Sequence, residues 1–456
     1  MGHIKSRKTY TMQQTEEIET LSKAYREFLD RSKTERECIN EAIDMAEAAG
    51  YVSLETKMGS LKSADKVYFQ CMGKALALFH IGCRPIEEGL FILGAHTDSP
   101  RLDLKQQPLY EDQGLAFFDT HYYGGIKKYQ WVTIPLAIHG IVAKKDGSIV
   151  EIKLGDEDGD PVFCVTDLLI HLASEQQEKR GSKVIEGEKL DILIGSSPLE
   201  GTEKDAVKAN VLAFLNNQYG ITEEDFVSAE LEAVPAGRTR EVGFDRSMIL
   251  GYGHDDRACA FASLQALLKL QSPSRTACCV LVDKEEIGSV GATGAQSRFF
   301  ENAIAEILSR TQGYRELSLR HCLSHSRMLS SDVSAAYDPL YSSVFDSHNS
   351  AYLGNGVVFN KYTGSRGKSG SSDANAEYVA LIRKIMDEAN IAFQMAELGK
   401  VDAGGGGTIA YLFAKYGMNV IDCGVPVLSM HAPWEIISKT DLYEAFRCYL
   451  AFFEQE

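Results

Sequence analysis

The chain has 456 residues, long enough for more than one structural unit with a large buried core. Its hydrophobic content of 44% and charged content of 24% are typical of a soluble globular protein. The formal net charge of −17 argues against nucleic acid or an anionic membrane as a partner. No apolar run reaches the length of a membrane span, and the N-terminus lacks the apolar core of a signal peptide. The ten cysteines form no Cys-x-x-Cys pair, so we expect a cytoplasmic protein without disulfides.

The N-terminal part of the chain predicts helices followed by buried strands. Residues 13–48 carry apolar side chains at helical spacing, which indicates two amphipathic helices broken near Ser32. Residues 67–80 alternate or run apolar, and residues 89–95 read as a second buried strand. That strand ends at the polar segment 96–100, His-Thr-Asp-Ser-Pro.

Composition changes after about residue 105, where short strands and Gly or Asp turns dominate. We interpret residues 106–244 as an inserted β-rich domain that separates two α/β halves, residues 1–105 and 245–456. The elements expected in this insertion are a hairpin over 133–143 and 148–154, helices over 167–178 and 203–219, and strands over 225–234 and 241–251.

The α/β pattern resumes near Asp255 and continues to the C-terminus. The expected fold class is therefore α/β, a mixed sheet with flanking helices plus the inserted domain. The expected strands are 278–282, a weaker one ending at 330–331, and 419–430; the expected helices are 258–268, 298–311, 374–390, 408–416 and 439–454; residues 355–373 are expected to form a surface loop.

Two adjacent acids, Glu285 and Glu286, follow the apolar strand 278–282. In a parallel α/β sheet the C-terminal ends of the strands line the ligand crevice. One carboxylate there can bind a cation while its neighbour handles protons on a metal-bound water. An isolated Glu-Glu pair is more often an exposed acidic turn, so other segments have to support the functional interpretation.

Four further segments deliver acids or imidazoles after apolar runs or at a helix start. Imidazole and carboxylate together suit zinc, manganese or cobalt better than magnesium or calcium, and the set is large enough for two ions about 3.5–4 Å apart. Each group has a structural alternative, such as a helix cap at Asp255-Asp256 or a turn at Asp98. Asp98 could also orient the imidazole two residues before it. The candidate groups are His96, Asp98, Asp255, Asp256, Glu285, Glu286, Asp332 and His431.

The sequence resembles the M18 family of metalloaminopeptidases, the group that contains aspartyl aminopeptidase, over nearly the whole chain. The resemblance lies in five motifs in the family order: His-Thr-Asp-Ser-Pro at 96–100, Asp-Asp-Arg at 255–257, Glu-Glu-Ile-Gly-Ser at 285–289, Ser-Asp at 331–332 and Ser-Met-His-Ala at 429–432. The related M42 group shares the metal motifs, whereas Gly-Gly-Thr-Ile at 406–409 and the closing helix look more like M18.

The resemblance implies a dinuclear aminopeptidase that removes the N-terminal residue from peptides with a free N-terminus. It implies two divalent ions, zinc first and manganese or cobalt as alternatives. It also implies a homo-oligomer, commonly a dodecamer, in which the inserted lid domain makes dimer contacts.

The resemblance also implies a role for each site residue. His96 and Asp332 would be terminal ligands on different ions, Asp255 would bridge the ions, and Glu286 and His431 would complete the two shells. Glu285 would be the general base on the bridging water, and Asp98 would orient His96.

Two positions depart from the family pattern. The histidine that helps to stabilise the oxyanion matches Asp167 here, and an ionised carboxylate cannot donate a hydrogen bond. The lysine that holds an acidic substrate side chain matches Asn360, with Lys361 beside it, so the preference for acidic or neutral N-terminal residues stays open. We favour substrate binding over packing for Gly404–Gly407, and a structural or surface role for His254 and His348.

Two other functions remain alternatives on the sequence alone. One is a metal-dependent deacylase or carboxypeptidase that acts on small N-acyl amino acids. The other is a non-catalytic assembly protein that kept the fold, although every metal-motif position holds a competent ligand.

Overall fold

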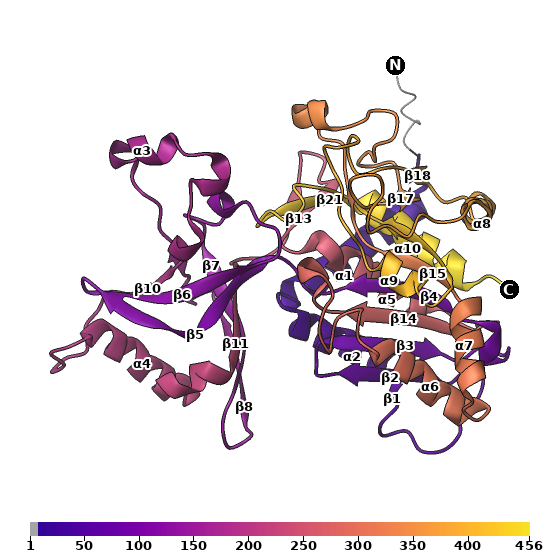
Figure 1. Ribbon diagram of the computed structural model, residues 1–456, viewed down its shortest axis with the longest axis horizontal. Helices are drawn as coiled ribbons and strands as arrows, with labels where there is room; N and C mark the ends of the chain where they lie inside the picture. Colours follow the sequence, from indigo (N-terminus) through magenta and orange to yellow (C-terminus); the bar gives the residue numbers. More distant parts are fainter. Residues whose placement is uncertain (1–7) are drawn as a thin grey trace. The chain divides into compact units, whose positions relative to one another are not determined.

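A nine-stranded mixed sheet organises the larger part of the protein in the computed structural model, which describes residues 8–456 (Figure 1). The strand order is β1-β2-β3-β14-β4-β15-β19-β17-β18. These strands are β1 (Val52–Ser53), β2 (Lys66–Cys71), β3 (Ala75–His80), β14 (Ala277–Val282), β4 (Phe91–His96), β15 (Arg327–Ser331), β19 (Asn419–Gly424), β17 (Val357–Asn360) and β18 (Phe393–Met395).

Four neighbouring strands, β14, β4, β15 and β19, run parallel at the centre of this sheet. All six residues of both β14 and β4 are buried, as expected for parallel strands covered on both faces. Because these strands are parallel, their C-terminal ends meet at one edge of the sheet, and the segments that follow them emerge side by side.

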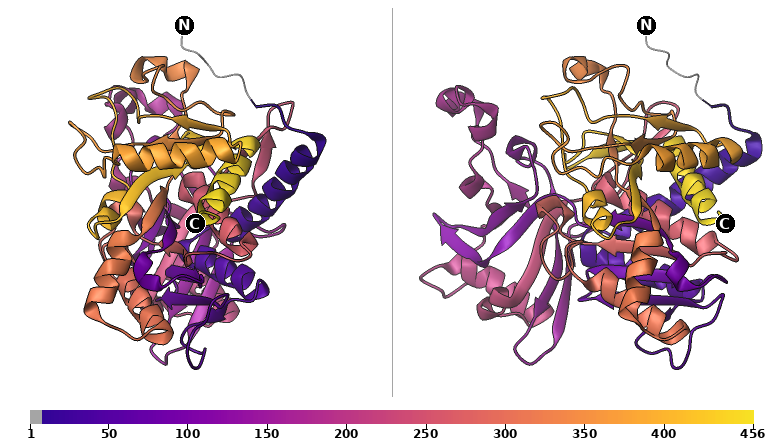
Figure 2. Two further views of the ribbon diagram at one scale, coloured as in Figure 1. Left: turned by 90° about the vertical axis from the view of Figure 1, so that its right-hand side faces the viewer. Right: turned by 45° about the vertical axis from the view of Figure 1, so that its right-hand side comes forward.

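Alternate residues of β14 point into two separate hydrophobic clusters. Cys279 and Leu281 pack with α1 (Met12–Arg31), α2 (Glu35–Ala48), α5 (His254–Lys269), α8 (Ala376–Glu388) and α10 (Lys439–Phe453). Cys278 and Val280 pack with α6 (Phe299–Thr311), α7 (Glu316–His325) and α9 (Ala410–Ala414). The sheet therefore lies between two helical layers, which Figure 2 shows from two further sides.

The expected α/β class and its main elements are confirmed. Helices α1 and α2 break at Ser32–Thr34, where Thr34 caps α2 by accepting a hydrogen bond from the main-chain N–H of Glu37. The expected surface loop over 355–373 is wrong at its start, because residues 357–360 form the buried strand β17, which pairs with β19.

A second sheet completes this unit, with the order β12-β13-β21-β20-β16. Its strands are β12 (Arg240–Val242), β13 (Met248–Gly251), β21 (Glu435–Ser438), β20 (Pro426–Leu428) and β16 (Ser334–Ala335). Among the described residues, the compact unit formed by the two sheets and their helices comprises residues 8–98, 239–430 and 435–456.

The second compact unit comprises residues 99–238 and 431–434 and is built on a seven-stranded antiparallel sheet. Its strand order is β8-β7-β11-β5-β6-β10-β9. The strands are β5 (Arg101–Asp112), β6 (Leu115–Tyr123), β7 (Leu136–Ala143), β8 (Ile149–Leu154), β9 (Cys164–Val165), β10 (Ile192–Gly195) and β11 (Ala229–Pro235), and the helices are α3 (Ser174–Gln177) and α4 (Ala206–Tyr219). This division falls a few residues before the expected boundaries because β5 already begins at Arg101 and β12 belongs to the first unit.

Two element predictions that fall in the second unit are wrong. The helix expected over 167–178 is reduced to a single 3-10 turn at Ile170–Leu172 and the short α3. Most apolar side chains of this segment are exposed, so no buried apolar face stabilises a longer helix. The strand expected from residue 225 begins only at Ala229, since Glu223–Ser228 form a 3-10 turn capped by Thr222.

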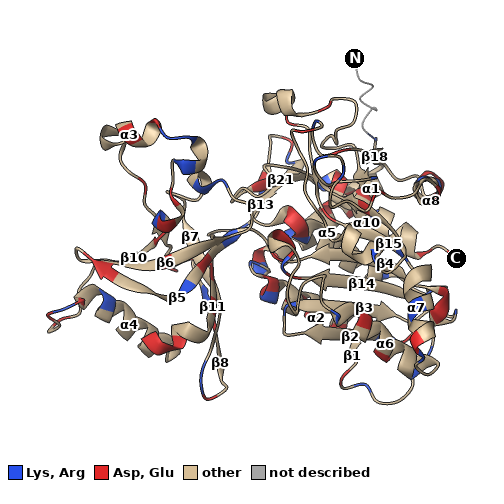
Figure 3. Cartoon of the chain, in the orientation of Figure 1, with Lys and Arg blue, Asp and Glu red and all other residues tan. Residues whose placement is uncertain are grey.

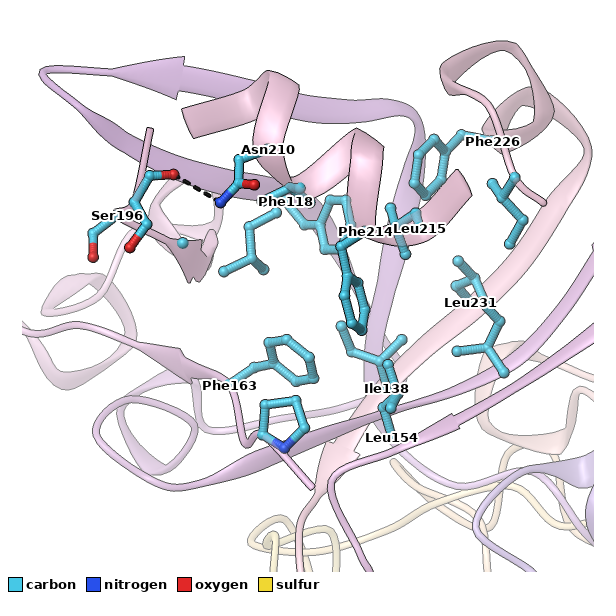
Figure 4. A pocket seen from close by; sticks show the side chains of 17 residues that line it. Phe118, Ile138, Leu154, Phe163, Ser196, Asn210, Phe214, Leu215, Phe226 and Leu231 are labelled. Atoms are coloured by element: carbon cyan, nitrogen blue, oxygen red, sulfur yellow. Dashed lines mark hydrogen bonds between the residues drawn. The ribbon is translucent and has the colours of Figure 1, made fainter. Parts of the chain in front are cut away.

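A cavity of about 310 Å³ lies between α4 and the sheet of the second unit. Figure 4 shows Phe163, Phe214 and Ile138 around it and Ser196 and Asn210 at one end. None of the predicted metal ligands lines this cavity.

Acidic and basic residues are interspersed over both units (Figure 3). All ten cysteines are free thiols, and the sulfurs of Cys423 and Cys448 lie 3.9 Å apart. Within residues 8–456, no helix combines the length and apolarity that a membrane span requires.

Candidate metal centre

Three adjacent parallel strands bring predicted site residues to one edge of the large sheet. His96 is the last residue of β4, where it pairs with Val282, the last residue of β14. Glu285 and Glu286 follow β14 in a 3-10 turn, and Asp332 follows β15 on the other side of β4. The strand order β14-β4-β15 therefore places the imidazole between the two glutamates and Asp332.

The two nitrogens of the His96 ring have different partners. Nδ1 lies 3.0 Å from the main-chain oxygen of Asp98 and 3.4 Å from its Oδ1. Nε2 lies 3.2 Å from Oδ1 of Asp255. An imidazole held at Nδ1 in this way presents Nε2 as the ligand atom, which is the usual arrangement around metal-binding histidines.

The Asp98 side chain, which is fully buried, also holds the turn that carries the two glutamates. Its Oδ1 accepts the main-chain N–H of Glu285 and its Oδ2 accepts that of Glu286, each at 3.1 Å. Asp98 therefore links the β4 and β14 segments, a contact that the spacing of Asp98 from His96 did not indicate.

The start of α5 delivers two buried acids to the same edge. The main-chain N–H of Asp255 donates to Oε2 of Glu435 at 3.0 Å, and Oδ2 of Asp256 accepts from the main-chain N–H of His96 at 3.4 Å. Both aspartates depart from helical backbone geometry, so they do not simply extend α5. His254 has the expected structural role, since its ring is bonded to Tyr25 and to the carbonyl of Ile249.

Ligand atoms of these residues form overlapping groups in which all members lie within 4.8 Å of one another. One group contains His96, Asp256 and Asp332, and another contains His96, Glu285 and Glu286. The first group includes Asp256, whereas Asp255, the member of the pair expected as the ligand, belongs with Glu286 to a further group.

The electrostatics of the group favour a bound cation. Burial raises the pKa of Asp332 well above its usual value, and the neighbouring Asp256, Asp255 and Glu285 add to that rise. Burial alone would lower the pKa of His96, but the carboxylates of Asp255 and Asp98 outweigh it and raise the pKa. Carboxylates gathered this closely out of water repel one another unless positive charge offsets them, so the residues fit a divalent ion.

Two of the residues singled out by the sequence, His431 and Asp167, belong to the second unit. His431 belongs to the segment 431–434 of the second unit, where its Nδ1 lies 2.9 Å from the carbonyl of Gly125. Asp167 is exposed in the same unit, and its Oδ1 accepts from the main-chain N–H of Leu168 at 2.8 Å.

The segments expected near the substrate are engaged in the protein's own packing. Asn360 is buried and donates to the carbonyl of Ala396 at 2.8 Å, while Lys361 pairs with Asp373 at 2.9 Å. A Cβ on Gly405 would lie 2.3 Å from the carbonyl oxygen of Gly364, so this glycine permits a close approach between two loops.

The parallel sheet edge with its imidazole and clustered carboxylates suits a metal-dependent hydrolase. A family model described as aminopeptidase I zinc metalloprotease (M18) matches residues 28–453. The chain belongs to the M18 family of aminopeptidases. The sequence resemblance and the assignment as a metallo-hydrolase that acts as an aminopeptidase are thereby confirmed.

Similar proteins cover nearly the whole chain. A probable M18 family aminopeptidase 1 from Clostridium acetobutylicum is 60% identical over 447 residues, which cover 97% of this chain and 96% of that protein. The crystal structure of an M18 aminopeptidase from Thermotoga maritima superposes with a TM-score of 0.95 at 47% identity, covering 99% of this chain and 100% of the other. The crystal structure of aminopeptidase I from Clostridium acetobutylicum has a TM-score of 0.91 at 57% identity and covers 98% of both chains.

Proposed function

We propose that the enzyme is a dinuclear aminopeptidase, with zinc as the first candidate metal and manganese or cobalt as alternatives. The observation that carries this proposal is the number of ligand atoms gathered around His96, with Asp256 and Asp332 in one group and Glu285 and Glu286 in another. These donors are more than the three protein ligands that a single catalytic zinc needs.

In this proposal the ions are held by His96, Asp255, Glu286, Asp332 and His431. The chain leaves the first unit after Met430 and returns at Glu435, which binds the main chain of Asp255.

When bound, the ions would polarise the scissile carbonyl and make water a stronger acid. Glu285 is the group that we assign to move protons. Its Oε2 lies 3.9 Å from Nε2 of His96, close to the ligands, while its main chain is anchored to Asp98. Glu285 takes a proton from the attacking water and delivers it to the leaving amine. Asp98 orients His96 through Nδ1 and keeps the base in place.

Metal removal and a Glu285→Gln variant test this proposal together. Chelation should abolish hydrolysis of aminoacyl substrates, and zinc, manganese or cobalt should each be tested for restoring it. Glu285→Gln keeps the size of the side chain, so it should retain bound metal and lose about two to four orders of magnitude in kcat. An exposed glutamate on α8, Glu388→Gln, is the control. Normal turnover by Glu285→Gln would contradict the role assigned to Glu285. Hydrolysis of N-acyl substrates alone, with no cleavage of aminoacyl substrates, would contradict the assignment as an aminopeptidase.

We also propose that the enzyme is a homo-oligomer. A solved structure at 19% identity and TM-score 0.78 is described as an mApe1 dodecamer from yeast, and the likeness in fold makes a similar assembly of this chain worth testing. Light scattering on the purified protein tests it, and a monomeric mass at working concentration would contradict it.

A further inference from the structure

The segment that carries Glu285 and Glu286 is a loop closed at its base. After β14, the main-chain N–H of Asp283 donates to the carbonyl of Thr293 at 3.1 Å, and Asp283 pairs with Gly294 as an isolated parallel bridge. The chain thus leaves the sheet at Asp283, forms the glutamate turn and returns to the same point.

The Asp283 carboxylate holds both ends of this loop. It is 1% exposed, and its Oδ1 accepts the main-chain N–H of Lys284 at 2.8 Å. Its Oδ2 accepts from Nζ of Lys284 at 2.7 Å and from Oγ1 of Thr293 at 2.6 Å. Hydrogen bonds in which an ammonium group such as that of Lys284 donates to a buried carboxyl group are among the stronger ones in proteins.

Lys284, the residue directly before Glu285, needs such support. Its φ of +67° places a non-glycine residue in the left-handed region, at a cost of about 1–2 kcal/mol. Its carbonyl accepts the main-chain N–H of Ser289 at 2.6 Å, and its aliphatic stem lies over Gly291, where a Cβ would be 3.1 Å from Cδ and Cε. The turn of the backbone at Lys284 sets the direction in which Glu285 leaves the sheet.

We propose that Asp283, Lys284 and Thr293 form a clamp that positions Glu285 for proton transfer. None of the three belongs to the ligand groups around His96, so the clamp acts through Glu285. Asp98 holds the main chain of the turn from the β4 side, and the clamp holds it from the β14 side. This inference rests on the proposed role of Glu285 as the general base.

Variants of the two buried clamp residues test the inference. Thr293→Val keeps the shape of the side chain and removes the hydroxyl, Thr293→Ser keeps the hydroxyl, and Asp283→Asn replaces one acceptor oxygen by a donor. A displacement of the base by about 1 Å costs up to about a hundredfold in rate. We therefore expect kcat to fall about ten- to a hundredfold in Thr293→Val and Asp283→Asn, with KM and metal content as in the parent enzyme. Thr293→Ser should restore most of the lost kcat.

Asp65→Asn is the matched control. Asp65 also accepts from a main-chain N–H, that of Lys62 at 2.8 Å, and from a lysine ammonium, Nζ of Lys57 at 3.2 Å. Asp65 directly precedes β2, and the first residue of β2 pairs with His80. His80 in turn pairs with the first residue of β14, whereas Glu285 follows the last residue of β14. Asp65 therefore lies at the opposite edge of the sheet from Glu285. Asp65→Asn should leave kcat unchanged.

Glu285→Gln, measured in parallel, separates failure of the clamp from failure of the proposed base. Turnover by Glu285→Gln at the parent rate would overturn the base and the clamp together. If Glu285→Gln is inactive while Thr293→Val and Asp283→Asn both keep the parental kcat, the clamp is overturned and the proposed base is not. The clamp is also overturned if the variants lose activity only in proportion to the folded protein or the bound metal that they lose. It is overturned as well if Thr293→Ser does not restore kcat. Thermal unfolding and metal analysis of each variant provide these comparisons.

Discussion

Asp98 accepts the main-chain N–H of Glu285 at 3.1 Å while its own carbonyl contacts Nδ1 of His96 at 3.0 Å. One residue at the end of β4 therefore fixes both a predicted ligand and the predicted base. The contact joins the segments that follow two neighbouring strands of the sheet, which are separated in the chain by residues 99–238 of the second unit.

Asp98→Asn should impair turnover more than metal binding. An asparagine side chain is neutral and has only one acceptor oxygen, so one of the two glutamate N–H groups loses its acceptor altogether, at a cost of about 1.5–3 kcal/mol. We expect kcat to fall about ten- to a hundredfold through displacement of the turn. Steady-state kinetics with metal analysis check this, using the exposed Asp387→Asn on α8 as the control. Unchanged kinetics would show that the two hydrogen bonds are dispensable.

Asp332→Ala should change the number of bound ions. If Asp332 and Glu286 serve different ions, loss of Asp332 should reduce metal content from about two ions per chain to about one and abolish most of the activity. Elemental analysis after gel filtration measures this stoichiometry. A parent enzyme that holds a single ion, or a variant that still holds two, would contradict the dinuclear arrangement.

Gly424→Ala should disturb the position of Asp332. A Cβ at residue 424 would lie 1.8 Å from the carbonyl oxygen of Asp332 and 2.9 Å from the sulfur of Cys259, both buried in the first unit. Overpacking of this kind costs about 1–3 kcal/mol of unfolding free energy. We expect lower stability together with weaker metal retention, measured by denaturant unfolding and by dialysis against chelator. Gly181→Ala, where a Cβ would meet no atom within 4 Å, is the control and should behave as the parent.

Stability should depend on pH through His80, which is buried on β3. Burial, with a smaller contribution from Lys66, lowers the pKa of its imidazole to about 4. Between about pH 6.5 and pH 4 the unfolded chain binds a proton at this position that the folded chain does not. The unfolding free energy should therefore rise with pH across that window, by at most about 1.4 kcal/mol per pH unit for this group.

His80→Gln should remove that component of the pH dependence. The two proteins are compared by urea unfolding at several pH values, so that the other titrating groups cancel in the difference. The difference in unfolding free energy should change between pH 6.5 and pH 4 and stay constant above pH 7. A difference that is independent of pH would contradict a lowered pKa at His80.

The sequence by itself determined the class of the fold and predicted the segments that contribute to the candidate metal centre. Strands such as β14 and β4 are continuous apolar runs, and helices such as α1 and α10 repeat apolar residues at helical spacing, so local periodicity was enough to find them. The polar groups that follow these strands, His96 and Glu285 among them, were visible because a buried strand must end before a charged side chain can reach solvent or a metal.

Only the tertiary structure decided the contacts that connect those segments. The bonds from Asp98 to the glutamate turn, from Asp283 to Thr293 and from Asp256 to His96 join residues whose separation in the chain ranges from ten positions to 188. Tertiary contacts also decided the structure of two segments. The short β17 is a strand because it pairs with β19. Residues 167–178 have a helical pattern but do not form one long helix, because most of their apolar side chains are exposed. Hydrogen bonds and packing of this kind depend on which surfaces meet in space, and neither residue type nor spacing carries that information.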